Sequence, residues 1–130
     1  MSTPFDELLT EHESLRARAE GMGGPDKLAR RRASGALNAR ERLNLLLDEG
    51  AWFESGLFAT SNRPEVQHKT PADGKITGFG RVDGRPIGLV ANDFTVLGAS
   101  SSVVNGKKIR HVKETATRRG MPLVFLGESS

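Results

Sequence analysis

Five small residues form the part of this sequence best suited to binding chemistry. They follow an apolar run at 87–91 and precede a helix-like segment at 103–119, after which a second apolar run occupies 123–126. Strand, loop, helix and strand in this order are typical of a βαβ unit, in which ligands collect at the carboxyl ends of the strands. The candidate ligand-binding residues are Gly98, Ala99, Ser100, Ser101 and Ser102.

The residue types in this loop suit contact through the main chain. Small side chains let a ligand approach the backbone N–H groups that the N-terminus of a helix leaves free. The serines have two interpretations: they donate hydrogen bonds to a ligand, or they only cap the helix that follows. The sequence leaves both interpretations open.

Composition excludes several other chemistries. The chain has no cysteine, so disulfides and thiolate catalysis are excluded. None of the three histidines, His12, His68 and His111, has a second metal ligand at helical spacing. We therefore expect no metal in this chain. A net charge of +3 with a sequence pI near 9.7 suits an anionic ligand. Basic patches interleaved with aromatic residues are lacking and tyrosine is absent, so we expect no nucleic-acid partner.

The N-terminal sequence carries no targeting signal that we recognise. A hydrophobic signal core is missing, the first residues are acidic rather than arginine-rich, and no apolar run reaches the length of a membrane span. We expect a cytoplasmic protein with no membrane partner.

Residues 1–50 are predicted to form a helical arm. Thr3 and Pro4 suit the start of a helix that runs to about Glu20. Asn38 and Glu41 have the spacing of a capping box, and the helix they begin is expected to end at Gly50. That helix should bury Leu43, Leu46 and Leu47.

A short helix at 26–33 contains the densest positive cluster of the chain. Such a cluster is usually a solvated face, but it can also bind phosphates or acidic residues of a partner subunit. Its members are Lys27, Arg30, Arg31 and Arg32.

Residues 51–130 are predicted to form an α/β domain. Trp52 and Phe53 should anchor the arm on a sheet, and 56–73 should be a long irregular connection. Runs at 74–82 and 85–91 joined by Asp83-Gly84 predict a hairpin. In the helix at 103–119, we expect one face toward the sheet and the lysines and arginines outward. The expected inner face is Val103, Val104, Ile109, Val112 and Ala116, and the outer residues include Lys107 and Lys108.

The apolar run at 123–126 should be a strand covered on both faces. Only the four residues 127–130 follow it, so we expect the chain to stop in the middle of a larger fold.

From residue 38 to 130 the sequence resembles the N-terminal half of the carboxyltransferase (beta) subunit of biotin-dependent acyl-CoA carboxylases, the propionyl-CoA and acetyl-CoA carboxylase group. Order and spacing make the shared motifs specific. The matching stretches are Ala39-Arg40-Glu41-Arg42-Leu43 with Leu46-Leu47-Asp48, Gly84-Arg85-Pro86, Asp93-Phe94-Thr95-Val96, Lys107-Lys108-Ile109 and Gly127-Glu128-Ser129-Ser130.

This resemblance implies a partial crotonase-type fold of stacked β-β-α units, preceded by the helical arm. It implies transfer of a carboxyl group from carboxybiotin, carried on a partner protein, to the α-carbon of an acyl-CoA. Expected partners are the acyl-CoA substrate, a biotin carboxylase and biotin carrier, and further copies of the chain in a homo-oligomer. The loop 98–102 would lie against coenzyme A.

By the same resemblance, Ser129 and Ser130 would supply backbone donors to part of an oxyanion hole. The sequence departs from the family at two places. The family commonly has Phe-Gly-Gly-Ser where this chain has Leu97-Gly98-Ala99-Ser100, and Asp-Ser-Gly-Gly-Ala-Arg where this chain has Glu128-Ser129-Ser130.

Two alternatives stay open. One is an acyl-CoA decarboxylase subunit of the same fold, and the other is a non-catalytic fragment that binds coenzyme A or a partner. For the 130 residues alone we expect no turnover.

Overall fold

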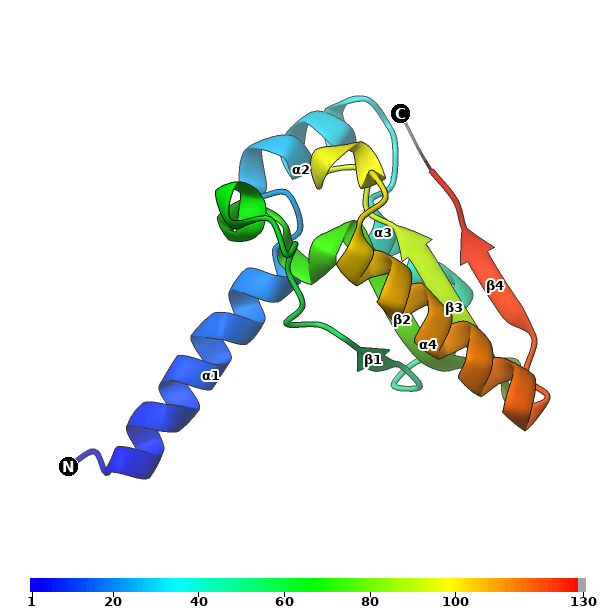
Figure 1. The fold of residues 1–130 in the computed structure, drawn as a ribbon, viewed down its shortest axis with the longest axis horizontal. Coiled ribbons are helices and arrows are strands. Elements are labelled where there is room, and N and C mark those ends of the chain that lie inside the picture. Colours follow the sequence, from blue (N-terminus) through cyan, green and yellow to red (C-terminus); the bar gives the residue numbers. More distant parts are fainter. Residues whose placement is uncertain (129–130) are drawn as a thin grey trace.

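The computed structural model describes residues 1–128 and has a twisted sheet with helices on both sides (Figure 1). The helical arm precedes the sheet in the chain, as predicted. The helices are α1 (Pro4–Glu20), α2 (Pro25–Ala33), α3 (Ala39–Leu46) and α4 (Val103–Arg119), with short 3-10 helices at Pro64–Lys69, Pro71–Gly74 and Leu97–Ala99. The strands are β1 (Phe53–Ser55), β2 (Lys75–Val82), β3 (Arg85–Asn92) and β4 (Leu123–Leu126).

The sheet follows the order β1-β2-β3-β4. β1, β2 and β3 are antiparallel neighbours, whereas β4 pairs with β3 in parallel. The predicted hairpin is confirmed, with Asp83 and Gly84 both at positive φ in its tight turn. Asp48, at the end of the helical segment, accepts hydrogen bonds from the N–H groups of both turn residues at 2.9 and 2.8 Å. The predicted βαβ unit is confirmed as β3-α4-β4.

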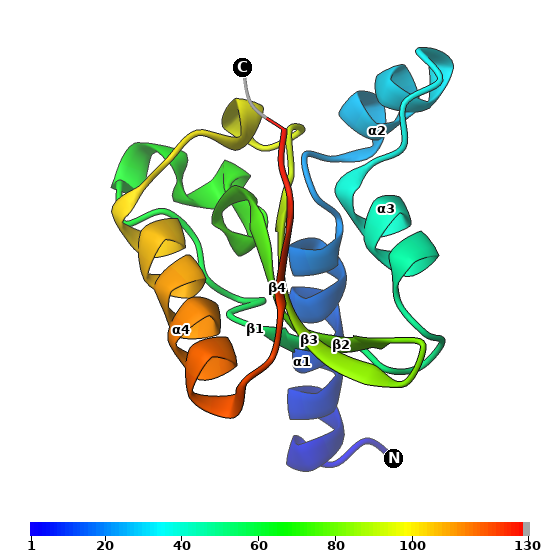
Figure 2. The same ribbon diagram turned by 90° about the vertical axis from the view of Figure 1, so that its right-hand side faces the viewer.

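Helices α3 and α4 cover opposite faces of the sheet (Figure 2). Alternation along β3 explains this division, because successive residues of a strand point to opposite faces. Leu89 is completely buried in the cluster that includes Leu43 of α3, while Gly88 lies close to Val112 of α4. The core on the α3 side comprises Met22, Ala39, Leu43, Leu47, Ile76, Ile87, Leu89 and Ala91.

Three of the four predicted ends of α1 and α3 agree with the structure. Both predicted starts are confirmed, since Thr3 and Asn38 each form a complete capping box, and α1 ends at Glu20. The expected end of α3 at Gly50 is wrong, because Leu47 turns into extended geometry and packs its side chain into the core. Leu46 is only partly buried.

Three predicted burial patterns differ from the structure. In α4, Val103 is 61% exposed and Lys108 is buried, because the inner stripe is formed by Asn105, Lys108, Val112 and Ala116. Phe53 is 69% exposed, so Trp52 alone anchors this segment. β4 is an edge strand of the described sheet, and its half-exposed side chains do not fit a strand covered on both faces.

Candidate functional site

The predicted ligand loop lies at the carboxyl end of β3, beside the end of β4. Ala91 pairs with Leu126 in the parallel register, and Asn92 donates from Nδ2 to the carbonyl oxygen of Glu128 at 2.8 Å. The loop at 98–102 therefore lies at the same end of the sheet as the chain that leaves β4, as expected for a site at the carboxyl edge of a sheet. The predicted oxyanion residues Ser129 and Ser130 lie outside the described residues.

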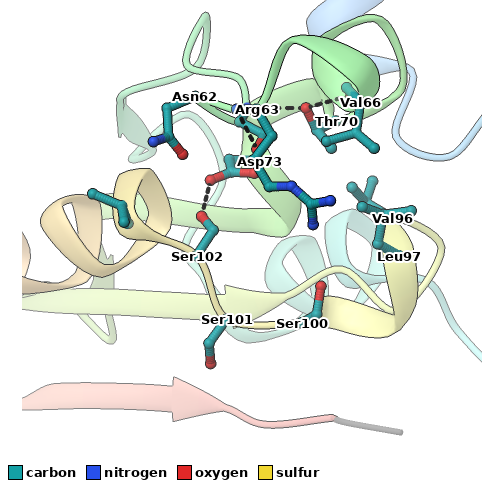
Figure 3. Close-up of a pocket in the computed structure, with 12 residues that line it drawn as sticks. Asn62, Arg63, Val66, Thr70, Asp73, Val96, Leu97, Ser100, Ser101 and Ser102 are labelled. Atoms are coloured by element: carbon teal, nitrogen blue, oxygen red, sulfur yellow. Dashed lines mark hydrogen bonds between the residues drawn. The ribbon is translucent and has the colours of Figure 1, made fainter.

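A cavity of about 260 Å³ opens along this loop (Figure 3). Its other wall comes from the connection before β2, which the sequence predicted as irregular. The lining residues are Ser61, Asn62, Arg63, Val66, Thr70, Asp73, Val96, Leu97, Ser100, Ser101, Ser102 and Val103. Arg63 supplies a cationic side chain, exposed and paired with Glu65 at 2.6 Å.

Two adjacent turns in this region have the left-handed backbone conformation. Leu97, Gly98 and Ala99 have φ of 46°, 61° and 58°, and the turn before β2 at residues 72–74 has φ of 52°, 47° and 71°. A side chain at such φ costs about 1–2 kcal/mol, so the surrounding contacts must compensate. Ala99 is 4% exposed, so the methyl group that departs from the family glycine is buried and does not cover the loop surface.

Buried donors connect the two turns. Lys75 donates from Nζ to the carbonyl oxygen of Ala99 at 2.6 Å. Asn105 donates from Nδ2 to the carbonyl oxygens of Asp73 and Ser100, at 3.0 and 2.9 Å. Both donor side chains are buried, so each bond forms with little competition from water.

Lys108 of α4 adds two further hydrogen bonds where the turn before β2 meets that strand. Its ammonium group donates to the carbonyl oxygen of Ala72 and, at 2.5 Å, to that of Lys75. Burial lowers the pKa of Lys108 to about 8, although the carboxylates of Glu54 and Asp73 oppose this shift. Burial likewise lowers the pKa of Lys75.

The serines divide between the two interpretations that the sequence left open. Ser102 is the N-cap of α4: its Oγ accepts from the N–H of Asn105 and donates to the carboxylate of Asp73 (Figure 3). Within residues 1–128, no hydrogen bond uses the hydroxyl groups of Ser100 or Ser101. These two serines line the cavity and remain available to a ligand.

The basic cluster of α2 reaches the same end of the sheet. Arg31 forms an ion pair with Glu128 at 2.5 Å, and Lys27 donates to the carbonyl oxygen of Thr95 at 3.2 Å. Thr95 in turn donates to the buried carboxylate of Asp93, whose pKa is raised by burial. Two members of the cluster thus bind acceptors of this chain rather than forming a purely solvated face.

Four residues of the site were not predicted from the sequence, namely Asp73, Lys75, Asn105 and Lys108. Asn105 had a detectable signal, because it stands three residues after the N-cap Ser102 and completes its capping box. No sequence signal indicated that Lys75 and Lys108 are buried, since lysine is seldom buried.

The described residues outside this cavity were also candidates for a metal site, because three histidines lie among them. Across residues 1–128 no group of three or more metal-ligating side chains lies together. His12 and His111 pack edge-on against Phe58 and Phe79. None of the helices in this range combines the length and the apolar character needed to cross a bilayer.

Comparison with known proteins assigns a family to this architecture. The carboxyl transferase domain matches residues 30–130. The propionyl-CoA carboxylase beta chain of Roseobacter denitrificans is 37% identical over 126 residues, which cover 95% of this chain and 25% of that protein. The methylmalonyl-CoA decarboxylase subunit alpha of Veillonella parvula is 33% identical, covering 99% of this chain and 26% of that protein.

A solved structure agrees with these sequences. The transcarboxylase 12S hexamer, with methylmalonyl-coenzyme A and methylmalonic acid bound, superposes with a TM-score of 0.91 at 31% identity, covering 100% of this chain and 26% of that one. The chain thus spans about a quarter of the length of these relatives.

Proposed function

Because this chain belongs to the carboxyl transferase domain family, we propose that it forms part of an enzyme that transfers a carboxyl group from carboxybiotin to the α-carbon of an acyl-CoA. Its fold is part of the crotonase-type α/β fold. We further propose a division into the helical arm, 1–50, and the first part of the carboxyltransferase domain, 51–130.

One observation carries this proposal: the strained loop 97–102 and the end of β4 lie at the same edge of the sheet, and a cavity opens along the loop. Carboxylation of a thioester at its α-carbon passes through an enolate, whose oxygen needs preorganised hydrogen-bond donors. Losing one such donor typically slows a reaction by about 100- to 1,000-fold. A site of this kind needs main-chain groups and no nucleophilic side chain.

The proposed roles follow the geometry. Gly98, Ala99, Ser100, Ser101 and Ser102 contact coenzyme A, and backbone donors at Ser129 and Ser130 form part of the oxyanion hole. The carboxyl group comes from biotin on a partner protein. The hexamer of transcarboxylase 12S supports the proposal that copies of this chain assemble in a homo-oligomer. A cytoplasmic location is likewise a proposal.

A second function has specific support. The similarity to the methylmalonyl-CoA decarboxylase subunit, at 33% identity, is close to that of the carboxylase relatives. The two reactions run in opposite directions over the same acyl-CoA chemistry, so an acyl-CoA decarboxylase subunit is the alternative.

Binding of coenzyme A tests the ligand part of the proposal. In isothermal titration with propionyl-CoA, we expect the 130-residue chain to bind with a measurable heat, because the loop and its cavity are formed by residues that the chain contains. Arg63→Gln should weaken binding by about 10-fold, since a charge-assisted hydrogen bond to a phosphate is lost. Arg85→Gln, in the hairpin on another part of the surface, is the matched control. Absence of binding by the unmodified chain contradicts the proposal.

Turnover tests the catalytic part. With a biotin carboxylase, a biotinylated carrier, ATP and bicarbonate, the 130-residue chain alone should form no methylmalonyl-CoA from propionyl-CoA, because it spans a quarter of the relatives. A full-length homologous beta chain is the positive control. Product formed by this chain alone contradicts the expectation, and coenzyme A binding without any activity in a completed enzyme favours the non-catalytic alternative.

A further inference from the structure

The two left-handed turns share a property that their strain alone does not explain. Carbonyl oxygens from both turns are directed onto buried donors of this chain: those of Ala72 and Asp73 in the first turn, and that of Ala99 and its neighbour Ser100 in the second. Carbonyl oxygens that accept buried hydrogen bonds are not directed at the loop surface. The side of the loop toward the cavity therefore presents hydroxyl groups rather than these acceptors.

The donors Lys75 and Asn105 belong to two elements outside the loop. Lys75 is the first residue of β2, where it pairs with Asn92, and Asn105 belongs to the first turn of α4. Their positions are therefore fixed by the sheet and the helix. Asn105 also accepts from the N–H of Ser102 at 2.9 Å, so its amide plane has a single orientation. The carboxylate of Asp73 holds Ser102 and the N–H of Asn105 from the other side.

Resting on the proposed function, we infer that Lys75 and Asn105 are positioning residues for the binding of the phosphate groups of coenzyme A. They hold the carbonyl oxygens of Ala99 and Ser100 inward, away from the anionic part of the ligand. A carbonyl oxygen that turned toward a phosphate would repel it, and a turn of the Ser100 carbonyl would also move the N–H of Ser101 away from it. The role is indirect, because both side chains are buried and donate to carbonyl oxygens of the loop.

The test separates the anionic part of the ligand from the rest. Coenzyme A carries phosphate groups, whereas pantetheine has the same thiol arm and no charge. For Lys75→Met in the full 130-residue chain, titration calorimetry should give a dissociation constant for coenzyme A about 10-fold higher, the effect of losing a charged donor. Pantetheine binding should change by less than about 2-fold, because no phosphate is involved.

Rescue and control variants distinguish positioning from general destabilisation. Lys75→Arg keeps a cationic donor and should bind coenzyme A within about 3-fold of the unmodified chain. Lys113→Met removes an exposed lysine from α4 and should leave both dissociation constants unchanged. Asn105→Leu removes the donor to the carbonyl oxygen of Ser100. This variant replaces Lys75→Met in the same titrations if Lys75→Met does not fold.

The possible results are distinct. Selective loss of coenzyme A affinity with rescue by arginine supports the inference. Unchanged affinity, or equal loss for coenzyme A and pantetheine, overturns it while the proposed function stands. No binding of coenzyme A by the unmodified chain overturns both.

Discussion

Gly78→Ala is expected to destabilise the fold by about 3 kcal/mol, near the upper end for overpacking in a core. A methyl group at position 78 would lie 2.2 Å from the carbonyl oxygen of Phe53 and 2.8 Å from Cη2 of Trp52. Gly78 pairs with Glu54 in the sheet, so relief of the clash requires β1 to separate from β2. Separation would also disturb the ion pair between Glu54 and Arg40 at 2.7 Å.

Urea denaturation measures this difference in the free energy of unfolding. Gly106→Ala is the matched control, because Gly106 lies within α4 and a methyl group there meets no atom within 4 Å. Alanine is the better helix former, so this variant should gain about 0.5–1 kcal/mol. Equal stability of Gly78→Ala and the unmodified chain would show that β1 does not pack as described.

The stability of the chain is expected to rise between pH 8 and pH 10.5, in contrast to the usual maximum nearer neutrality. The pKa of Lys108 is about 8 in the folded chain against an ordinary value of 10.5. Between these values the unfolded chain binds more protons than the folded chain, so the free energy of unfolding increases with pH. The full effect is about 3 kcal/mol. Burial lowers the pKa of Lys75 in the same direction.

Denaturation curves at a series of pH values across this range measure the slope. The chain has no tyrosine and no cysteine, so phenol and thiol groups do not contribute. Neutral Lys108 still has two N–H groups for its two carbonyl acceptors, so deprotonation costs neither hydrogen bond. Lys108→Met should remove most of the slope, whereas Lys113→Met should leave it in place. Falling stability across this range in the unmodified chain would contradict the burial of Lys108.

The sequence was sufficient for those parts of the fold that local rules determine. Asp83-Gly84 between two apolar runs predicted the hairpin, and a capping residue with its partner three positions later predicted the start of α3. The order of strand, small-residue loop, helix and strand predicted the βαβ unit. Each of these signals depends on residues close together in the chain, where backbone sterics and capping operate.

The parts that sequence analysis missed depend on contacts between distant segments. Lys108 was assigned to the outer face of α4, since the apolar residues suggested another stripe. It is buried because the carbonyl oxygens of Ala72 and Lys75 lie beneath it, more than 30 residues earlier in the chain. The positive φ of Ala72 and Ala99 was equally hidden, because alanine gives no sign of a left-handed turn.

The single indole of this chain has an optical consequence. Trp52 is the only tryptophan and the chain has no tyrosine. The emission of Trp52 therefore reports on the contact between β1 and β2, where its Nε1 donates to Glu54 beside Gly78. Helix α1 projects from the body with Ala19 as its one buried residue, far from that contact in sequence (Figure 1). Circular dichroism registers the helices, α1 included, whereas fluorescence reports on the surroundings of Trp52. The two signals followed together during heating therefore distinguish fraying of the projecting helix from opening of the sheet.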